Sequence, residues 1–391
     1  MRTLNTLAEN SHLNSISAVS ATITCFTMGA LLFLLMPVYL GALADSYGFD
    51  YKQVGWLASL ELLGQAMSAC SAMFWVRKVS WRKVIALSGM LLIVVNLLSI
   101  YVGGSYPWLL LVRWVSGVAV GCVLSVGCTA LGDTLRVDRN FAFLIAVEML
   151  VQSMLFACLP AYISAHGVKV FYLVLAVSAV IILLMAFFIA SNGSEDNQGT
   201  GGRVSNLRLA SISLAATILF FIGIMMVFSF VERLGVFRGL SAEDIGLALS
   251  ISTFFSITGA LAASVLGDHL GRLLPMVIAL FGLVLAIGVL LMPLAFWGYF
   301  TGLSLMLVCW NFWVPYQMST VAIIDPSGRY VVLIPMAQSL GVSVAPALAG
   351  QILGHSNYVG VLMAGTFFLV ASLGLFTATL KDDQRINSAG V

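Results

Sequence analysis

The sequence predicts an all-α membrane protein with 12 transmembrane helices in two six-helix bundles and with both termini in the cytoplasm. Three observations lead to this fold class. Hydrophobic residues make up 61% of the 391 residues and charged residues only 9%, whereas charged residues are about a quarter of an average soluble domain. Apolar stretches recur that are long enough for the roughly 20 helical residues that cross a bilayer. One polar, Gly-rich segment divides these stretches into two sets of six.

The apolar stretches should be helices, because backbone groups in lipid have to satisfy their own hydrogen bonds. Transmembrane β-strands would instead show segments of about ten residues with alternating hydrophobicity, which the sequence lacks. In chain order the expected spans are 17–42, 53–76, 83–103, 107–131, 141–165, 168–191, 208–232, 243–267, 273–296, 298–323, 330–352 and 358–380.

The dividing segment, 191–207, is expected to be a flexible cytoplasmic linker. From Ser191 to Asn206 it reads SNGSEDNQGTGGRVSN, and such a density of Gly, Ser, Asn and Asp is typical of linkers. It separates an N-terminal bundle, 1–190, from a C-terminal bundle, 208–391. Basic loops after the second and fourth spans recur after the eighth and tenth, which indicates two parallel repeats.

The Lys and Arg residues predict the orientation. Of the 18, the spans place 13 on the side of the N-terminus, four on the other side, and one inside a span. Cytoplasmic loops carry an excess of basic residues, so both termini are expected in the cytoplasm and the protein in the cytoplasmic (inner) membrane. The net charge of +2 follows from this topology and does not indicate nucleic-acid binding.

Enzyme and metal motifs are absent from the sequence. The six Cys residues are scattered through spans without CxxC spacing, the four His residues lie in loops or near span ends, and there is no HExxH, GxSxG or Walker loop. We therefore expect no enzymatic activity, no metal and no cofactor. Without an ATP-binding module, energy for transport would have to come from a gradient, with the proton gradient preferred.

Two motifs and the six-linker-six arrangement resemble the major facilitator superfamily over nearly the whole chain. The loop SVLGDHLGR, Ser264–Arg272, keeps the Asp, Gly and Arg of the family's GxLaDrxGRR pattern. Span four reads LLLVRWVSGVAVG, in which Arg113, Gly117 and Gly121 match the family's RxxxGxxxG pattern. The two glycines also predict a close-packing seam. The resemblance implies a secondary transporter that works by alternating access, with spans one, four, seven and ten around a central cavity.

The subfamily is distantly like drug- and sugar-efflux members, whose first-half loop is also degenerate. In that loop Arg77 stands where the family has its Asp, and the antiporter pattern gxxxGPxxGG is missing from span five, which offers only Leu159–Pro160. The resemblance implies a cytoplasmic latch that closes one side of the transporter. Its expected gating residues are Asp268, Arg272, Arg77, Arg139 and Arg329.

Three ionisable residues lie well inside spans, where each costs roughly 2.5–3.5 kcal/mol to insert. Glu61 and Arg113 both lie roughly 10 Å below the outer surface at 1.5 Å per residue, so they are expected to meet across the N-terminal bundle. Glu148 lies roughly 12 Å above the cytoplasmic surface. We interpret these three as proton-coupling residues; the alternative for the pair is a permanent structural contact, and for Glu148 a hydrogen bond to a neighbouring helix.

Polar and aromatic residues near these positions are candidate substrate contacts. Gln65 and Gln152 follow Glu61 and Glu148 by one helical turn, and span ten places three residues on one face at i, i+3 and i+7 spacing. Aromatic packing is the alternative for that face. The expected substrate-binding residues are Gln65, Gln152, Trp310, Trp313, Gln317, Gln338 and Tyr39.

Two buried acids against one buried Arg favour a neutral or cationic substrate over a polyanion. We expect a monomeric, proton-coupled transporter that exports a small amphipathic drug or metabolite. Uptake of a small organic nutrient or chelator is the alternative, and a membrane receptor that does not transport is a third. The expected partners are the substrate, protons and the lipid bilayer, with no nucleic acid.

Overall fold

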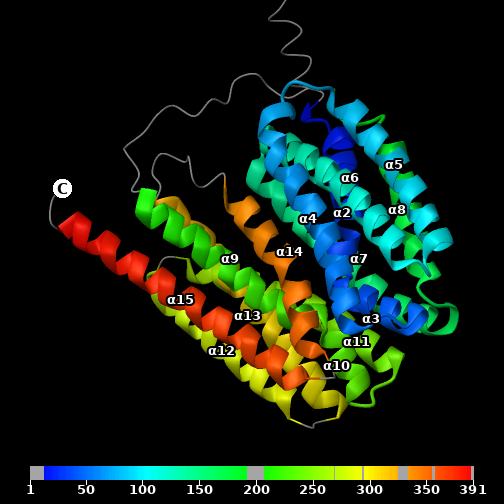
Figure 1. Cartoon of the computed structure of the whole chain (residues 1–391). Helices are drawn as coiled ribbons and strands as arrows, with labels where there is room; N and C mark the ends of the chain where they lie inside the picture. Colours follow the sequence, from blue (N-terminus) through cyan, green and yellow to red (C-terminus); the bar gives the residue numbers. More distant parts are fainter. Residues whose placement is uncertain are drawn as a thin grey trace, which may run out of the picture. The chain divides into compact units, whose positions relative to one another are not determined.

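The computed structural model describes residues 13–191, 207–267, 269–292, 295–324, 333–354 and 357–388, and within them the secondary structure is helical (Figure 1). Ten helices of this described part are long and apolar enough to cross a membrane. The sixth predicted span is also an apolar helix, but a shorter one, Lys169–Met185. The tenth is a helix of 29 residues, Phe296–Ile324, whose Asn, Gln and aromatic side chains make it less hydropathic. The chain is a multi-pass membrane protein.

The first compact unit comprises Met1–Phe49, Trp56–Leu155 and Tyr162–Gln198. Its helices correspond to the first six predicted spans, with span one divided into two helices. They are α2 (Ile16–Leu34), α3 (Met36–Tyr47), α4 (Tyr51–Trp75), α5 (Trp81–Val102), α6 (Tyr106–Gly132), α7 (Val137–His166) and α8 (Lys169–Met185).

The second unit comprises Asp50–Gly55, Phe156–Ala161 and Gly199–Val391, so α4 and α7 each contribute a short segment to it. Its own helices correspond to the last six predicted spans. They are α9 (Leu207–Ser229), α10 (Val231–Phe237), α11 (Ala242–Leu266), α12 (Leu273–Leu291), α13 (Phe296–Ile324), α14 (Ile334–Leu353) and α15 (Tyr358–Ser388). The predicted linker, apart from its first and last residues, lies outside the described residues.

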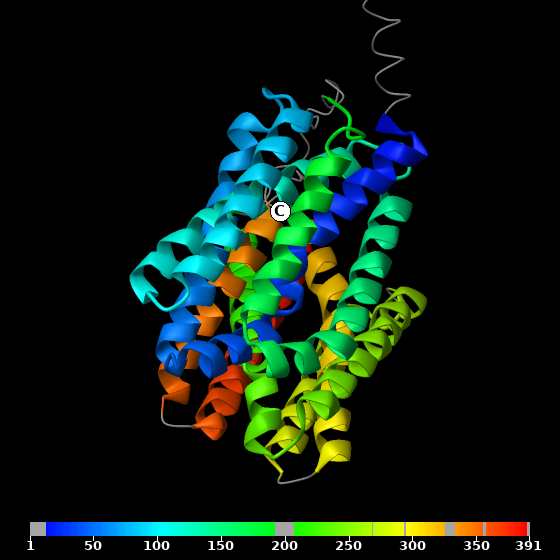
Figure 2. The same ribbon diagram turned by 90° about the vertical axis from the view of Figure 1, so that its right-hand side faces the viewer.

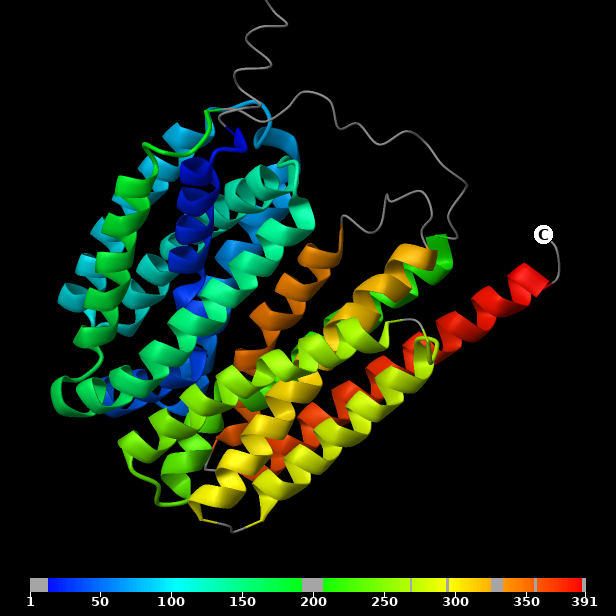
Figure 3. The same cartoon turned by 180° about the vertical axis from the view of Figure 1, so that it is seen from behind.

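The same helix pairings recur inside the two units. In the first unit α5 packs against α6 and α8, and α2 packs against α8; Figure 2 shows α5 and α6 as neighbouring cyan helices joined by a short connection. In the second unit α12 packs against α13 and α15, and α9 packs against α15; in Figure 3 the yellow α12 runs beside the red α15. The pairings of spans three, four and six thus repeat among spans nine, ten and twelve, as expected for parallel repeats.

Spans one and seven are each interrupted by a single non-helical residue. Leu35, between α2 and α3, has φ −102° and ψ 18°, and Phe230, between α9 and α10, has φ −112° and ψ 12°. At the first break Pro37 opens the new helix, where its missing N–H costs no hydrogen bond. The side-chain amide of Gln152 donates a hydrogen bond of 2.7 Å to the carbonyl of Leu34, which satisfies backbone exposed by the break.

Candidate functional site

Three glycines bring α4 and α6 together in the first unit. A Cβ atom on Gly117 would collide with the carbonyl oxygen of Glu61 and lie 3.2 Å from the backbone nitrogen of Gln65. A Cβ on Gly121 would lie 2.7 Å from the Cβ of Ser68, and one on Gly64 would lie 2.6 Å from the carbonyl oxygen of α6 residue Trp114. The predicted seam is confirmed. It brings the α6 backbone directly against the backbone of Glu61.

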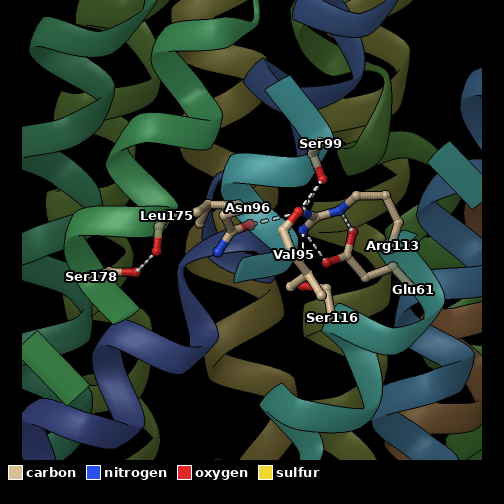
Figure 4. Close-up of polar contacts among 8 residues, drawn as sticks. All are labelled: Glu61, Val95, Asn96, Ser99, Arg113, Ser116, Leu175 and Ser178. Atoms are coloured by element: carbon tan, nitrogen blue, oxygen red, sulfur yellow. Dashed lines mark hydrogen bonds and ion pairs between the residues drawn. The ribbon is translucent and has the colours of Figure 1, made fainter. Parts of the chain in front are cut away.

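Glu61 and Arg113 form a buried ion pair across this seam (Figure 4). The Nε of Arg113 donates to Oε2 of Glu61 at 2.9 Å, and its Nη2 donates to Oε1. The side chains are 3% and 1% exposed, respectively. This two-bond geometry, in which both carboxylate oxygens accept, is the strong form of an Arg–carboxylate contact.

Uncharged side chains take up the remaining hydrogens of the guanidinium. Its Nη1 donates to Oδ1 of Asn96 at 2.8 Å and to Oγ of Ser99 at 3.3 Å, and its Nη2 also donates to Oγ of Ser116 at 3.1 Å (Figure 4). A guanidinium has five N–H donors, and here all five have an acceptor. Two of the five acceptor contacts depend on the carboxylate of Glu61, so the network is complete only while Glu61 is unprotonated and in place.

Two tyrosine rings flank the same guanidinium. The Cζ atom of Arg113 lies 5.4 Å from the ring centre of Tyr172 and 6.0 Å from that of Tyr39, within the range of a cation–π contact. Tyr39 also stacks on Phe171, with centroids 4.8 Å apart. The hydroxyl groups of Tyr39 and Tyr172 are buried and have no hydrogen-bond partner among the described residues. Tyr39, predicted to bind substrate, is therefore fully buried beside the ion pair.

Glu148 lies apart from this network. Its side chain is half-buried in α7, and it makes no ion pair or side-chain hydrogen bond in the described part of the chain. Gln152, one turn further along α7, is 6% exposed and uses its amide on the break after α2. The two residues therefore do not form one polar stripe. Glu148 has a carboxylate without a positive partner in the described residues, and the amide of Gln152 is bonded to the backbone of Leu34.

The predicted aromatic face of span ten is mostly part of the core of the second unit. Trp313 is fully buried and stacks on Phe220, with centroids 4.8 Å apart and the planes inclined by 3°. Its indole N–H donates to Oε1 of Gln317 at 2.9 Å. Gln317 is also fully buried, and its Nε2 has no partner among the described residues. In this arrangement Trp313 and Gln317 contact other side chains of α9 and α13, so a substrate reaches them only if this packing opens.

The remaining predicted substrate contacts are more accessible. Trp310 is partly buried and meets Phe228 edge to face at 5.6 Å. Gln65 in α4 and Gln338 in α14 are half-buried, and their side chains make no hydrogen bond within the described ranges. These three side chains and that of Glu148 are each partly exposed.

The predicted gating residues differ in their contacts. Arg77 donates two hydrogen bonds to Asp133, at 3.0 and 2.9 Å, from the loop after α4 to the end of α6, and this contact raises the pKa of the Arg77 side chain. In the second unit the Nε of Arg272 donates to Oγ of Ser319 at 3.2 Å. Arg139 is exposed, with its Cζ 5.9 Å from the ring of Phe143. Asp268 and Arg329 lie outside the described residues.

Sequence reasoning missed four members of the network: Asn96, Ser99, Ser116 and Tyr172. Asn96 could have been found, because it is a lone amide in an apolar run and α5 and α6 are joined by a short turn. Counting back and forward from that turn places Asn96 and Arg113 at the same depth. Serine and tyrosine are too common in transmembrane helices to give such a signal.

Comparison with known proteins identifies related sequences and folds. The sequence model described as Major Facilitator Superfamily matches residues 21–346, whereas none of the curated proteins matches at a significant level. The crystal structure of the D-xylose-proton symporter superposes with a TM-score of 0.72 at 13% identity, covering 92% of this chain and 96% of that chain.

Two further solved structures are similar. That of the nucleoside transporter NupG has a TM-score of 0.68 at 14% identity and covers 94% of this chain and 99% of that chain. A bacterial homolog to the human lysosomal transporter Spinster, in an inward-facing and unoccupied conformation, has a TM-score of 0.61 at 14% identity and covers 95% of each chain. At such identities these structures establish the fold alone.

Proposed function

Because this chain belongs to the Major Facilitator Superfamily, whose members are transporters and not enzymes, we propose that it is a proton-coupled secondary active transporter. It moves a small neutral or cationic organic molecule across the cytoplasmic membrane by alternating access. The proposal includes 12 membrane crossings with both termini in the cytoplasm, supported by the basic residues concentrated on one side. It also includes two bundles, 1–190 and 208–391, that move as separate bodies connected by the linker 191–207 in a monomer.

The buried contact between Glu61 and Arg113 carries the proposal. Arg113 keeps its charge at every physiological pH, so Glu61 is the member of the pair that can bind a proton. Protonation removes the counter-charge and places a hydrogen on one of the two carboxylate oxygens that accept from a fully buried guanidinium. Such an uncompensated buried charge is strongly unfavourable. Proton binding therefore favours a different arrangement of α4 and α6, and this dependence is what couples a proton to a conformational change.

Glu148 supports the choice of substrate class. The charges of Glu61 and Arg113 cancel, whereas Glu148 is half-buried without a positive partner in the described residues. A cationic group on the substrate, or a second proton, would compensate it. In the first unit Gln65 adds an amide to this carboxylate, and in the second unit Trp310 and Gln338 provide an aromatic surface and an amide; the groups of each unit suit a neutral or cationic amphipathic molecule.

Export of a drug-like molecule or metabolite is the first candidate for direction, because the altered loop after α4 resembles that of efflux members. Proton-coupled uptake of a nutrient or chelator is the second candidate. The observation that favours it is the absence of the antiporter glycines around Pro160, together with the fold shared with the D-xylose-proton symporter. The sign of the substrate flux under an imposed pH gradient distinguishes the two.

The test is Glu61→Gln in proteoliposomes, with substrates first found by a thermal-shift ligand screen of purified protein. Gln keeps the shape of Glu but cannot titrate. The variant should lose gradient-driven flux of substrate and keep exchange of substrate across the membrane without a gradient. Glu148→Gln measures the competing site, and Glu243→Gln, at an exposed carboxylate in the first turn of α11, is the matched control. Flux of the Glu61→Gln variant that still follows the pH gradient would refute the role of Glu61. Ligand binding without any flux in the parent protein would indicate a receptor.

A further inference from the structure

A small cavity adjoins the ion pair inside the first unit. Its volume is about 10 Å³, close to the smallest cavity that holds one water molecule. Its polar lining consists of Glu61, Asn96, Arg113, Ser116 and Ser178, and apolar side chains of α2, α5, α6 and α8 complete the wall. Each of the five polar residues is at least nine-tenths buried. A site this small excludes organic ligands.

Asn96 presents an unused hydrogen-bond donor. Its Oδ1 accepts from Arg113, and because a guanidinium only donates, the oxygen must be the atom that faces it. The NH₂ group is therefore turned to the opposite side, toward α8 (Figure 4). Asn96 is 2% exposed, and this NH₂ group has no partner among the described residues. Buried amide groups are rarely left in this state, and ordered water is a common partner.

Ser178 on α8 presents the complementary acceptor. Its hydroxyl donates to the carbonyl of Leu175 at 2.8 Å, so its hydrogen is used and its lone pairs are available. One water molecule fits this set, since it can accept from Asn96 and donate both to Ser178 and to the carboxylate of Glu61. A metal cation fits poorly, because the NH₂ group of Asn96 would face it and the positive charge of Arg113 already adjoins the cavity.

We propose that this cavity is a water site through which the proton reaches and leaves Glu61. The water passes one of its hydrogens to a carboxylate oxygen of Glu61 while its own oxygen takes up a proton from solvent water, giving neutral water and a carboxylic acid, and the reverse step releases the proton. The neutral water that remains can accept a hydrogen bond from the guanidinium hydrogens that Glu61 releases. The role of the water rests on the proposed function of Glu61 as the titrating group.

The charged and titratable groups around Glu61 are consistent with this route. Arg113 faces it from α6, and the rings of Tyr39 and Tyr172, from α3 and α8, flank that same guanidinium. The α5 residues of the network, Asn96 and Ser99, and the α2 residues of the cavity wall are uncharged. No second acid competes for the proton among the side chains that line the cavity.

The first test asks whether the cavity contains water. Hydroxyl radicals generated from bound water by X-ray pulses label nearby side chains, and mass spectrometry locates the label. Leu92 and Leu175 line the cavity and are 3% and 6% exposed, so they should be labelled in the parent protein only if water lies beside them. Ser178→Val adds volume and removes the acceptor, and it should lower this labelling at least tenfold. Unlabelled Leu92 and Leu175 in the parent protein would overturn the proposal.

The second test measures proton-coupled flux in proteoliposomes. Ser178→Val should slow gradient-driven flux at least tenfold and leave gradient-free exchange unchanged, with Ser178→Ala as the substitute if the Val variant does not fold. Ser343→Val is the matched control, because Ser343 is 2% exposed and also donates to the residue three positions before it, Leu340, at 2.9 Å. Unchanged gradient-driven flux in Ser178→Val would overturn the route even where Glu61→Gln loses coupling. Retained coupling in Glu61→Gln would instead refute the proposed function.

Discussion

Removing the charge of Glu61 should destabilise the first unit more than removing the charge of Arg113. The reason is an asymmetry between the two groups. A carboxylate left alone in an apolar interior can become neutral by binding a proton, whereas a guanidinium cannot lose its proton in a protein. Glu61→Gln therefore leaves a permanent buried charge, and Arg113→Gln leaves a group that can neutralise itself.

The size of the effect follows from the contacts. Breaking a buried ion pair by removing one partner costs about 3–5 kcal/mol. In Glu61→Gln the guanidinium keeps Asn96, Ser99 and Ser116 as acceptors, and the amide oxygen of Gln can replace one of the two lost contacts. We therefore expect a loss of about 3 kcal/mol, at the lower end of that range. Arg113→Gln should lose less unfolding free energy at acidic pH, where Glu61 is readily protonated, than at alkaline pH.

The assay is a double-mutant cycle on unfolding in detergent micelles, with Glu61→Gln, Arg113→Gln and the double variant compared with the parent protein. The double variant carries two neutral amides and should lose less stability than the sum of the single variants. Additive effects would show that the two side chains do not depend on each other. If Glu61→Gln loses no more unfolding free energy than the exposed control Glu243→Gln, the assignment of a buried charge is refuted.

Three further predictions concern the surroundings of the pair. Gly117→Ala should lose about 1–3 kcal/mol of unfolding free energy through overpacking, whereas Gly288→Ala, whose Cβ would meet nothing within 4 Å, should lose none. Tyr172→Phe removes a hydroxyl without a described partner, so its melting temperature should be equal or higher; a lower one contradicts this. The pKa of Arg77 is raised by its contact with Asp133. The stability that the charged side chain contributes is therefore fully present below the pKa of a free arginine, and it is lost only when the pH rises through the raised pKa. Arg77→Gln should therefore lose the same amount at about pH 5 and pH 9, at most about 1 kcal/mol for this half-exposed partner of Asp133.

The helices could be predicted well from the sequence because lipid imposes one simple requirement. Every long apolar stretch has to form a helix, and each of the predicted spans coincides with helical residues in the structure. The breaks within spans one and seven were not predicted. Pro37 gives a signal for the first, but Phe230 has no Pro or Gly within four residues on either side, so tertiary packing rather than local sequence has to determine the second.

The site was predictable only where charge marks it. Glu61 and Arg113 stand out because ionisable groups are costly in lipid, and helix geometry alone places them at one depth. The face of span ten shows the limit of such reasoning. Periodicity correctly places Trp313 and Gln317 together, but it cannot say which neighbour covers that face. The stacked ring of Phe220 covers it, and this contact comes from a helix about 90 residues earlier in the chain.

The two halves differ in where their charged residues lie, and this difference supports the proposed coupling role of the first half. The sequence of the last six spans has charged residues only near span ends, whereas spans two, four and five each carry one well inside. The buried polar groups at the Trp313–Gln317 contact are uncharged, with a donor on Gln317 left over. Neither an indole nor an amide exchanges a proton near neutral pH. The carboxylate of Glu232 in the second unit is paired with Arg233 at 2.7 Å near the end of span seven, so Glu61 remains our candidate for a proton site well inside a span. Under the proposed function, the C-terminal half would respond to that proton through the conformational change that follows loss of the Glu61–Arg113 contact.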